Sequence, residues 1–177
     1  RRFIGIILID ANNGSVLAII EAFALGQMRT GGISGLATDL MSRENATRMA
    51  MIGAGKQSIT QVAAVAAVRK LERVTVWSPT PANREALAAK VEASLGIEAV
   101  ATQALDEALD AADIVTLATR ARVPFLTADA LPSGVHINAV GAITPERAEF
   151  EPALLARTTV KACLRKRSMT CRIATRT

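Results

Sequence analysis

Residues 49 to 58 hold the pattern from which chemistry can be inferred most directly. The apolar run Met49-Ala50-Met51-Ile52 is followed by Gly53-Ala54-Gly55-Lys56-Gln57-Ser58. This order predicts a strand, a phosphate-binding turn and a helix N-terminus, because glycines permit a sharp turn and let a pyrophosphate approach backbone N–H groups. We therefore predict a nicotinamide dinucleotide as cofactor. Ser58 replaces the third glycine of the usual fingerprint, so an ordinary strand-to-helix turn stays open as the alternative.

A second chemical signal concerns the position that distinguishes NAD from NADP. In NAD-preferring folds of this type an Asp or Glu ends the second strand and accepts from the ribose 2′-hydroxyl. Here that position is Ser78, followed by Pro79, Thr80 and, six residues on, Arg84. A neutral hydroxyl with a nearby cation favours NADP over NAD. The same segment also suits an ordinary helix-entry turn in which Ser78 or Thr80 caps the helix.

These residues must be positioned by strands that alternate with helices. Strands are expected at 73–77, 97–100, 113–119 and 136–141, and helices at 61–70, 82–95 and 105–112. This alternation predicts an α/β fold with a Rossmann-like, doubly wound parallel sheet, helices on both faces, and ligands at the carboxyl ends of the strands. Thr119 and the turn Val140-Gly141-Ala142 are expected at that edge of the sheet.

The N-terminal segment is expected to belong to a second, substrate-binding or dimerisation domain. Residues 3–9 and 15–20 predict two strands joined at Asn12-Asn13-Gly14, whose Asn-Gly pair suits a hairpin turn. Residues 22–42 predict a helix, although Gly31, Gly32 and Gly35 weaken its propensity. We therefore predict a domain remnant over 1–42, a dinucleotide-binding domain over 43–157, and a divergent basic tail over 158–177.

Composition and charge exclude several classes of function. The chain has 177 residues, is 50% hydrophobic, and shows no signal peptide and no apolar run of membrane-spanning length, so a cytoplasmic enzyme is expected. Its net charge of +5 comes entirely from residues 161–177, which hold six Lys and Arg and no acid. No aromatic residue accompanies that charge, which argues against nucleic-acid binding. Cys163, Cys171 and the single His136 match no metal-site spacing, so no metal is predicted.

Five strings follow one another along the chain: Arg29-Thr30-Gly31-Gly32-Ile33-Ser34-Gly35-Leu36-Ala37-Thr38, Ile52-Gly53-Ala54-Gly55-Lys56-Gln57, Ala112-Asp113-Ile114-Val115, His136-Ile137-Asn138-Ala139-Val140-Gly141-Ala142 and Pro145-Glu146-Arg147-Ala148-Glu149-Phe150. In this order and at this spacing they closely resemble the ornithine cyclodeaminase and mu-crystallin family. The resemblance covers about residues 5 to 160 and implies an NAD(P)-dependent enzyme that works on amino acids and cyclic imines, typically as a homodimer.

The resemblance also implies roles for individual residues. Arg29 would face both the cofactor and the substrate carboxylate, which agrees with the two parallel hydrogen bonds that a guanidinium can give a carboxylate. Thr30 would lie near the phosphates, and residues 53 to 57 would hold the pyrophosphate. Thr119 would approach the cofactor, while Val140, Gly141 and Ala142 would lie beside the nicotinamide. Without the resemblance, a solvated surface arginine is an equally good interpretation of Arg29.

The resemblance leaves three readings of the reaction. Cyclodeaminases of the family carry an acid-base Asp shortly after the Val-Gly pair, and the matching residue here is Ile143, which cannot move protons. We therefore expect an NAD(P)H-dependent reductase of Δ1-pyrroline-2-carboxylate or a related ketimine. Ornithine cyclodeaminase activity and a non-catalytic nucleotide-binding fragment, or binding protein of the mu-crystallin sort, are the alternatives.

The resemblance further implies that the chain is a fragment. It places a substrate-binding arginine and an acid-base lysine upstream of residue 1, so no catalytic residue is named here. A fragment need not dimerise, and it is expected to expose apolar surface on residues 3–20. After residue 157 the family has an apolar strand ending in Asp, whereas this chain turns rich in Arg, Cys and Thr. A changed reading frame or a truncated gene is our hypothesis for that change.

Overall fold

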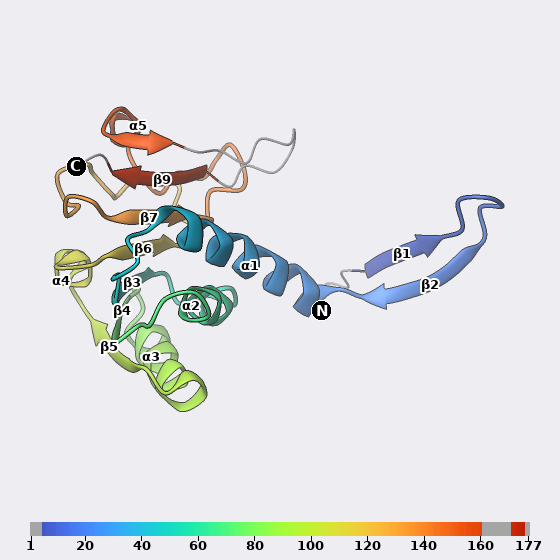
Figure 1. The fold of residues 1–177 in the computed structure, drawn as a ribbon, viewed down its shortest axis with the longest axis horizontal. Helices are drawn as coiled ribbons and strands as arrows, with labels where there is room; N and C mark the ends of the chain where they lie inside the picture. Colours follow the sequence, from blue (N-terminus) through green and yellow to red (C-terminus); the bar gives the residue numbers. More distant parts are fainter. Residues whose placement is uncertain (1–4, 161–170, 176–177) are drawn as a thin grey trace.

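A seven-stranded sheet forms the body of the computed structural model, which describes residues 5–160 and 171–175 (Figure 1). The strands are β3 (Arg48–Ile52), β4 (Arg73–Trp77), β5 (Glu98–Thr102), β6 (Ile114–Leu117), β7 (His136–Ala139), β8 (Thr158–Val160) and β9 (Cys171–Thr175). Their order is β5-β4-β3-β6-β7-β9-β8. The first five run parallel, as predicted, whereas β9 pairs antiparallel with β7 and with β8.

The strands β8 and β9 were not predicted from the sequence, which indicated only a basic tail from residue 158. Their backbones extend the parallel sheet at its β7 edge. Cys163 and the basic residues between these two strands lie outside the described residues, as does Arg176. The predicted domain boundaries stay predictions.

Helices cover both faces of the sheet because the strand residues alternate between two apolar cores. Met49 and Met51 face one core, while Ala50 and Ile52 face the other. The first core is covered by α2 (Ser58–Ala66) and α3 (Pro81–Leu95), and the second by α4 (Leu105–Leu109) and α5 (Ala153–Ala156). The helix α1 (Phe23–Met41) packs against α2, and the hydroxyl of its Thr38 accepts a hydrogen bond from the side chain of Asn138 in β7. Among the described residues, no helix has both the length and the apolar character that a membrane crossing requires. The predicted doubly wound fold is thus confirmed.

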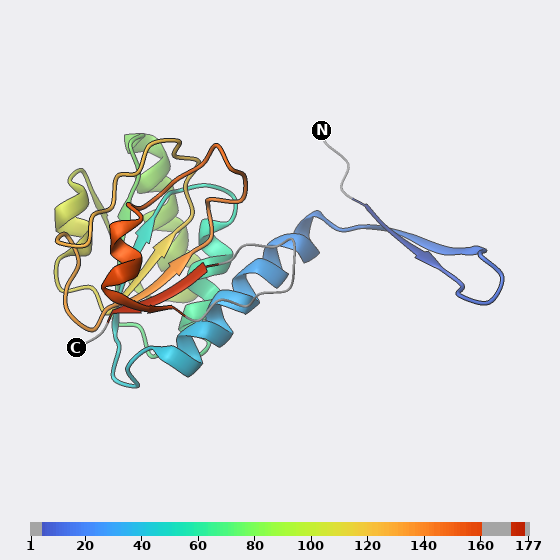
Figure 2. The ribbon, with the colours of Figure 1, turned by 90° about the horizontal axis from the view of Figure 1, so that it is seen from above.

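An N-terminal hairpin lies outside this body, as the sequence predicts. The strands β1 (Gly5–Ile9) and β2 (Val16–Glu21) pair antiparallel, and Gly14 takes the positive φ of +74° that the turn requires. Figure 2 shows the hairpin extending beyond the start of α1 and away from the sheet. Its aliphatic side chains are exposed on both faces, since the successive residues Ile6 and Ile7 are 43% and 58% accessible, so the expected apolar surface is present.

Direct backbone contact joins α1 to α2. A Cβ atom built on Gly31 would lie 2.7 Å from the carbonyl oxygen of Thr60, and one on Gly35 would lie 2.7 Å from that of Ala64. The glycines that weaken the helix as an isolated segment therefore make its packing possible, since only hydrogen atoms fit between the two backbones. Gly32, on the exposed face of the same helix, has nothing within 4 Å of a built Cβ.

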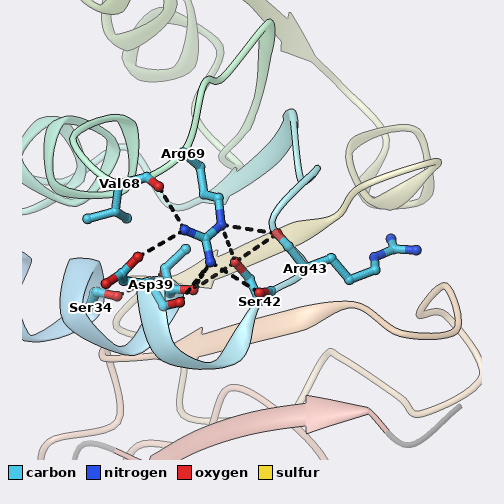
Figure 3. A network of polar contacts seen from close by, with 7 residues as sticks. Ser34, Asp39, Ser42, Arg43, Val68 and Arg69 are labelled. Carbon is cyan, nitrogen blue, oxygen red and sulfur yellow. Dashed lines mark hydrogen bonds and ion pairs between the residues drawn. The ribbon is translucent and has the colours of Figure 1, made fainter.

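A buried guanidinium closes the C-terminal end of α1 (Figure 3). The last turn of α1 contains no basic residue, and Arg69, which follows α2, supplies the cation from outside the helix. Its side chain is 7% exposed. Its nitrogens donate to carbonyl oxygens of Thr38, Asp39, Ser42, Arg43 and Val68, to the hydroxyl of Ser42, and to the carboxylate of Asp39, at 2.7 to 3.1 Å.

Replacing Arg69 by lysine should lower the free energy of unfolding by about 2 kcal/mol, because an ammonium keeps the charge but cannot reproduce the planar fork of donors. Urea unfolding followed by circular dichroism measures the change. The matched control is Arg43→Lys, since the Arg43 side chain is 52% exposed and its ion pair with Asp113 lies at the surface. That control should cost less than about 1 kcal/mol. Equal losses in the two variants would contradict the assigned role of Arg69.

Candidate functional site

A cavity of about 900 Å³ opens at the carboxyl ends of β3, β4, β6 and β7. The strand order reverses between β3 and β6, and parallel sheets bind ligands at such a switch point. Most of the predicted site residues line this cavity: Arg29, Thr30, Gly53, Ala54, Gly55, Lys56, Gln57, Ser78, Thr119, Val140 and Gly141. Three predicted residues, Thr80, Arg84 and Ala142, are not among its lining.

The glycine-rich turn has the geometry that its sequence predicts. Gly53 adopts a φ of +109°, and a Cβ there would lie 2.7 Å from the carbonyl oxygen of Ala118. Gly55 is exposed to the cavity and has open space where a Cβ would stand. Ser58, which replaces the third glycine, is buried and donates its hydroxyl to the carbonyl oxygen of Gly53 at 2.8 Å. The helix α2 begins at Ser58, directly after the turn as predicted, and it ends at Ala66, before the predicted end at residue 70.

Backbone N–H groups of this turn are available to a ligand. In the described part of the chain, those of residues 54 to 57 have no acceptor, whereas the N–H of Gly53 donates to the carbonyl oxygen of Trp77 and that of Ser58 donates to the carbonyl oxygen of Gly55. They precede the N-terminus of α2, where the helix dipole favours an anion. The side chain of Gln27 braces the turn by donating to the carbonyl oxygen of Lys56 at 2.9 Å. The start of α1 thus holds the turn in place.

The end of β4 carries the predicted cofactor-selecting residues. Ser78 is 6% exposed and lines the cavity, and the guanidinium of Arg84 donates to its carbonyl oxygen at 3.1 Å. Arg84 is therefore held beside the site although it is not part of the lining. Thr80 occupies the position before α3, but no side chain caps that helix, so the predicted entry turn forms without the predicted capping hydroxyl.

An aromatic pair on the cavity wall was missed by the sequence analysis. The rings of Trp77 and Phe125 lie 5.8 Å apart at 31°, and both line the cavity. Trp77 ends a predicted strand, which is a signal for its position, whereas the loop containing Phe125 gave no such signal. The other lining residues missed as binding positions are Pro79, Asn83, Ala118, Arg120, Ala121, Ile143 and Arg147.

Positive charge dominates the cavity. Its charged lining residues are Arg29, Lys56, Arg120 and Arg147, and no Asp or Glu is among the lining. This arrangement suits a ligand with phosphate and carboxylate groups. At the rim, a hydrogen bond from the Thr144 side chain, together with the Glu146 backbone and Arg147, lowers the pKa of the Glu146 carboxyl below its usual value. The described residues contain no cluster that could hold a metal ion.

A buried carboxylate ties the ends of β6 and β7 together. Glu149, which is 1% exposed, accepts from the backbone N–H of Thr119 at 2.6 Å, the hydroxyl of Thr119 at 2.7 Å, and the backbone N–H of Gly141 at 2.8 Å. A Cβ on Gly141 would collide with the Glu149 carboxylate and with the carbonyl oxygen of Thr119. Glu149 was not predicted as a site residue, although it lies within one of the family-like strings.

Two other residues of those strings lie at the opposite end of the sheet. His136 is 1% exposed at the start of β7, with its Nε2 3.2 Å from the side-chain oxygen of Asn138. The carboxylate of Asp113 accepts from the backbone N–H groups of Thr47 and Arg48. Neither residue lines the cavity.

Comparison with known proteins shows which family this chain belongs to. The sequence model of the ornithine cyclodeaminase/mu-crystallin family matches residues 3–167. The chain belongs to this family. The five family-like strings fall on α1, the glycine-rich turn, the start of β6, β7 with the turn that follows it, and the loop that contains Glu149. Arg29 and Thr119 line the cavity, and Glu149 is hydrogen-bonded to Thr119.

Relatives within the ornithine cyclodeaminase/mu-crystallin family include reductases and a cyclodeaminase. A Δ1-pyrroline-2-carboxylate reductase of Bacillus cereus is 35% identical over 151 residues, 85% of this chain and 46% of the relative. An L-lysine cyclodeaminase of Streptomyces rapamycinicus is 33% identical over 150 residues, 83% and 43% respectively. This chain spans about half the length of the curated relatives that it matches.

A solved structure confirms the fold assignment. The Δ1-pyrroline-2-carboxylate reductase of Thermococcus litoralis, in complex with NADH and L-proline, superimposes with a TM-score of 0.84 at 34% identity. The match covers 87% of this chain and 48% of that one. The ornithine cyclodeaminase/mu-crystallin fold of this chain is therefore Rossmann-like, with the N-terminal hairpin as an addition to it.

Proposed function

We propose that this chain is the dinucleotide-binding part of an NAD(P)H-dependent reductase of cyclic imino acids such as Δ1-pyrroline-2-carboxylate. One observation carries the proposal: in the described part of the chain, the N–H groups of residues 54 to 57 have no acceptor and lie at a cationic cavity at the switch point of the sheet. The open space at Gly55 fits a pyrophosphate. The reductases among the relatives support the choice of reaction.

Each part of the cavity has a role in this proposal. The turn at 53–57 binds the pyrophosphate, and Val140 and Gly141 lie beside the nicotinamide, which supplies hydride when bound. The guanidinium of Arg29, on the exposed side of α1 at the cavity, grips the substrate carboxylate. The aromatic pair of Trp77 and Phe125 excludes water from the wall beneath the β4 end.

Ile143 separates this proposal from cyclodeamination. Its side chain is 66% exposed, lines the cavity next to Gly141, and carries no group that could take up or release a proton. The family resemblance assigns the loss of ammonia to an Asp at this position, whereas reduction of a ready-made imine takes a hydride at carbon and a proton at nitrogen, and solvent can supply that proton. Cyclodeamination must be weighed against reduction because one of the relatives is an L-lysine cyclodeaminase.

Trp77 makes binding directly measurable, because it is the single tryptophan of the chain and it lines the cavity. We expect NADPH and NADH to quench its fluorescence saturably, and NADPH to be oxidised when Δ1-pyrroline-2-carboxylate is added. Absence of saturable binding by both coenzymes would refute the proposal. Binding without oxidation would favour a non-catalytic nucleotide-binding role, and ammonia release from L-ornithine would favour a cyclodeaminase.

Cofactor preference gives a further prediction. The guanidinium of Arg84, which donates to the carbonyl oxygen of Ser78, places a cation where the adenosine ribose is expected, and no carboxylate lines the cavity. Because NADPH carries a 2′-phosphate on this ribose, NADPH should bind more tightly than NADH. The Arg84→Gln variant should lose about fivefold in NADPH affinity, roughly 1 kcal/mol, with NADH affinity unchanged. Lys90→Gln, on the exposed face of the same helix, is the control. An NADH preference of tenfold in the unaltered chain would contradict this prediction.

A further inference from the structure

The hydrogen bonds around Thr119 leave its hydroxyl with one lone pair that can still accept a hydrogen bond. A hydroxyl has one proton to donate and two lone pairs that accept. The Thr119 hydroxyl donates to Oε1 of Glu149 at 2.7 Å, and it accepts from the backbone N–H of Ala121 at 3.2 Å. One lone pair therefore remains, on a side chain that lines the cavity.

The geometry of Glu149 prevents this hydroxyl from turning. Oε1 of Glu149 also accepts from the backbone N–H of Thr119 at 2.6 Å, and Oε2 accepts from the N–H of Gly141 at 2.8 Å. The carboxylate is 1% exposed, so water cannot replace these contacts. The backbone of Glu149 is also held in place, because its carbonyl oxygen accepts from the N–H groups of Phe125 and Leu126. Rotating the hydroxyl proton towards the cavity would leave this buried carboxylate short of a donor.

We infer that Glu149 is a positioning residue: it commits the proton of Thr119, so that Thr119 accepts from the bound cofactor and never donates to it. The cofactor atom at Thr119 must then be a hydrogen-bond donor at the nicotinamide riboside end, either a ribose hydroxyl or the carboxamide N–H. Phosphate and carboxylate oxygens are disfavoured there. This inference rests on the proposed function, which supplies the dinucleotide.

Paired substitutions test the inference through the fluorescence of Trp77. Thr119→Val removes the lone pair at nearly constant volume and should weaken NADH binding about tenfold, whereas Thr119→Ser keeps the hydroxyl and should stay within about twofold. Glu149→Gln should also weaken binding about tenfold. The amide NH₂ of Gln would either point at a backbone N–H that now donates to Glu149, or point at the Thr119 hydroxyl, whose proton would then be free to turn towards the cofactor. Glu151→Gln, an exposed carboxylate two residues away, should bind as the unaltered chain does.

Two further measurements separate positioning from a merely structural role. The double variant Thr119→Val with Glu149→Gln should lose much less NADH affinity than the product of the two single losses, since Glu149 acts through Thr119.

A cofactor analogue identifies the donor. Acetylpyridine adenine dinucleotide replaces the carboxamide by an acetyl group without N–H donors. If the donor is the carboxamide, the penalty of Thr119→Val disappears with this analogue; if the donor is a ribose hydroxyl, the penalty persists.

The outcomes are distinct. Equal NADH affinity of the unaltered chain and Thr119→Val would overturn the inference while leaving the proposed function intact. Equal losses in Thr119→Val and Thr119→Ser would also overturn it, because the hydroxyl would then be irrelevant. Failure of the unaltered chain to bind either coenzyme would instead refute the proposed function, and the inference with it. If Glu149→Gln does not fold, the comparison of the Val and Ser variants at Thr119 decides alone.

Discussion

Alanine at both Gly31 and Gly35 should lower the free energy of unfolding by about 4 kcal/mol, since overpacking typically costs 1–3 kcal/mol per site. Each new methyl group would stand 2.7 Å from a backbone carbonyl oxygen of α2, which cannot rotate away as a side chain could. The helices must separate, and the separation also moves Arg29 and Thr30, which project from α1 into the cavity. We therefore expect weaker coenzyme binding by whatever fraction stays folded.

Urea unfolding of the double variant measures this loss, with Gly32→Ala as the matched control. Gly32 lies between the two contact glycines on the exposed face of α1, where a methyl group meets nothing within 4 Å. The control should gain about 0.5–1 kcal/mol, because alanine is the better helix former. A double variant as stable as the control would show that α1 does not pack on α2 as described.

Alanine at Gly55 should weaken dinucleotide binding about a hundredfold, close to 2.7 kcal/mol, and leave the fold intact. A Cβ there meets no protein atom within 4 Å, and Gly55 does not have a positive φ, so the free protein tolerates the change. The methyl group would instead occupy the space through which a pyrophosphate reaches the N–H groups of the turn. Quenching of Trp77 by NADPH measures the affinity, and urea unfolding measures the stability.

Gly53→Ala should show the opposite behaviour and serves as the contrast. Gly53 has a φ of +109° and would place its Cβ 2.7 Å from the carbonyl oxygen of Ala118, so the variant should lose about 2–3 kcal/mol of stability. Alanine at these two glycines of one motif should therefore lower different properties: coenzyme affinity at Gly55 and folding stability at Gly53. Undiminished binding by a folded Gly55→Ala variant would contradict the placement of the pyrophosphate on this turn.

The glycine-rich turn and the strands around it could be predicted because their signals are local. β4 spans the predicted residues 73–77, and Gly53 has the positive φ that its place after an apolar run predicts. Thr80 was predicted from its place in the segment after β4, and Ala142 from the turn after β7 and from the resemblance; neither residue lines the cavity. The resemblance supplied Arg29, for which local pattern alone left a surface arginine as an equal alternative.

Contacts between distant positions could not be predicted in this way. Glu149 meets Thr119 across thirty residues, and Arg69 meets the end of α1 across 26 to 31. No local pattern distinguishes Arg69 from an exposed charge, and the family-like string that contains Glu149 does not indicate which residue Glu149 contacts. The pairing of β9 with β7 depends on the free edge of a sheet assembled from elsewhere in the chain.

The sequence by itself therefore determined the alternation of strands and helices in the parallel part of the sheet and the glycine-rich turn, because hydrophobic periodicity and glycine placement act within a few residues. The family followed from the resemblance of five strings. The folded arrangement alone decides which polar groups become partners. Parallel strands bring the ends of β6 and β7 together, and the buried carboxylate of Glu149 then settles which way the proton of Thr119 points. Such pairings follow from the whole sheet, since burial forces each polar group to find a partner from whatever segment the topology places beside it.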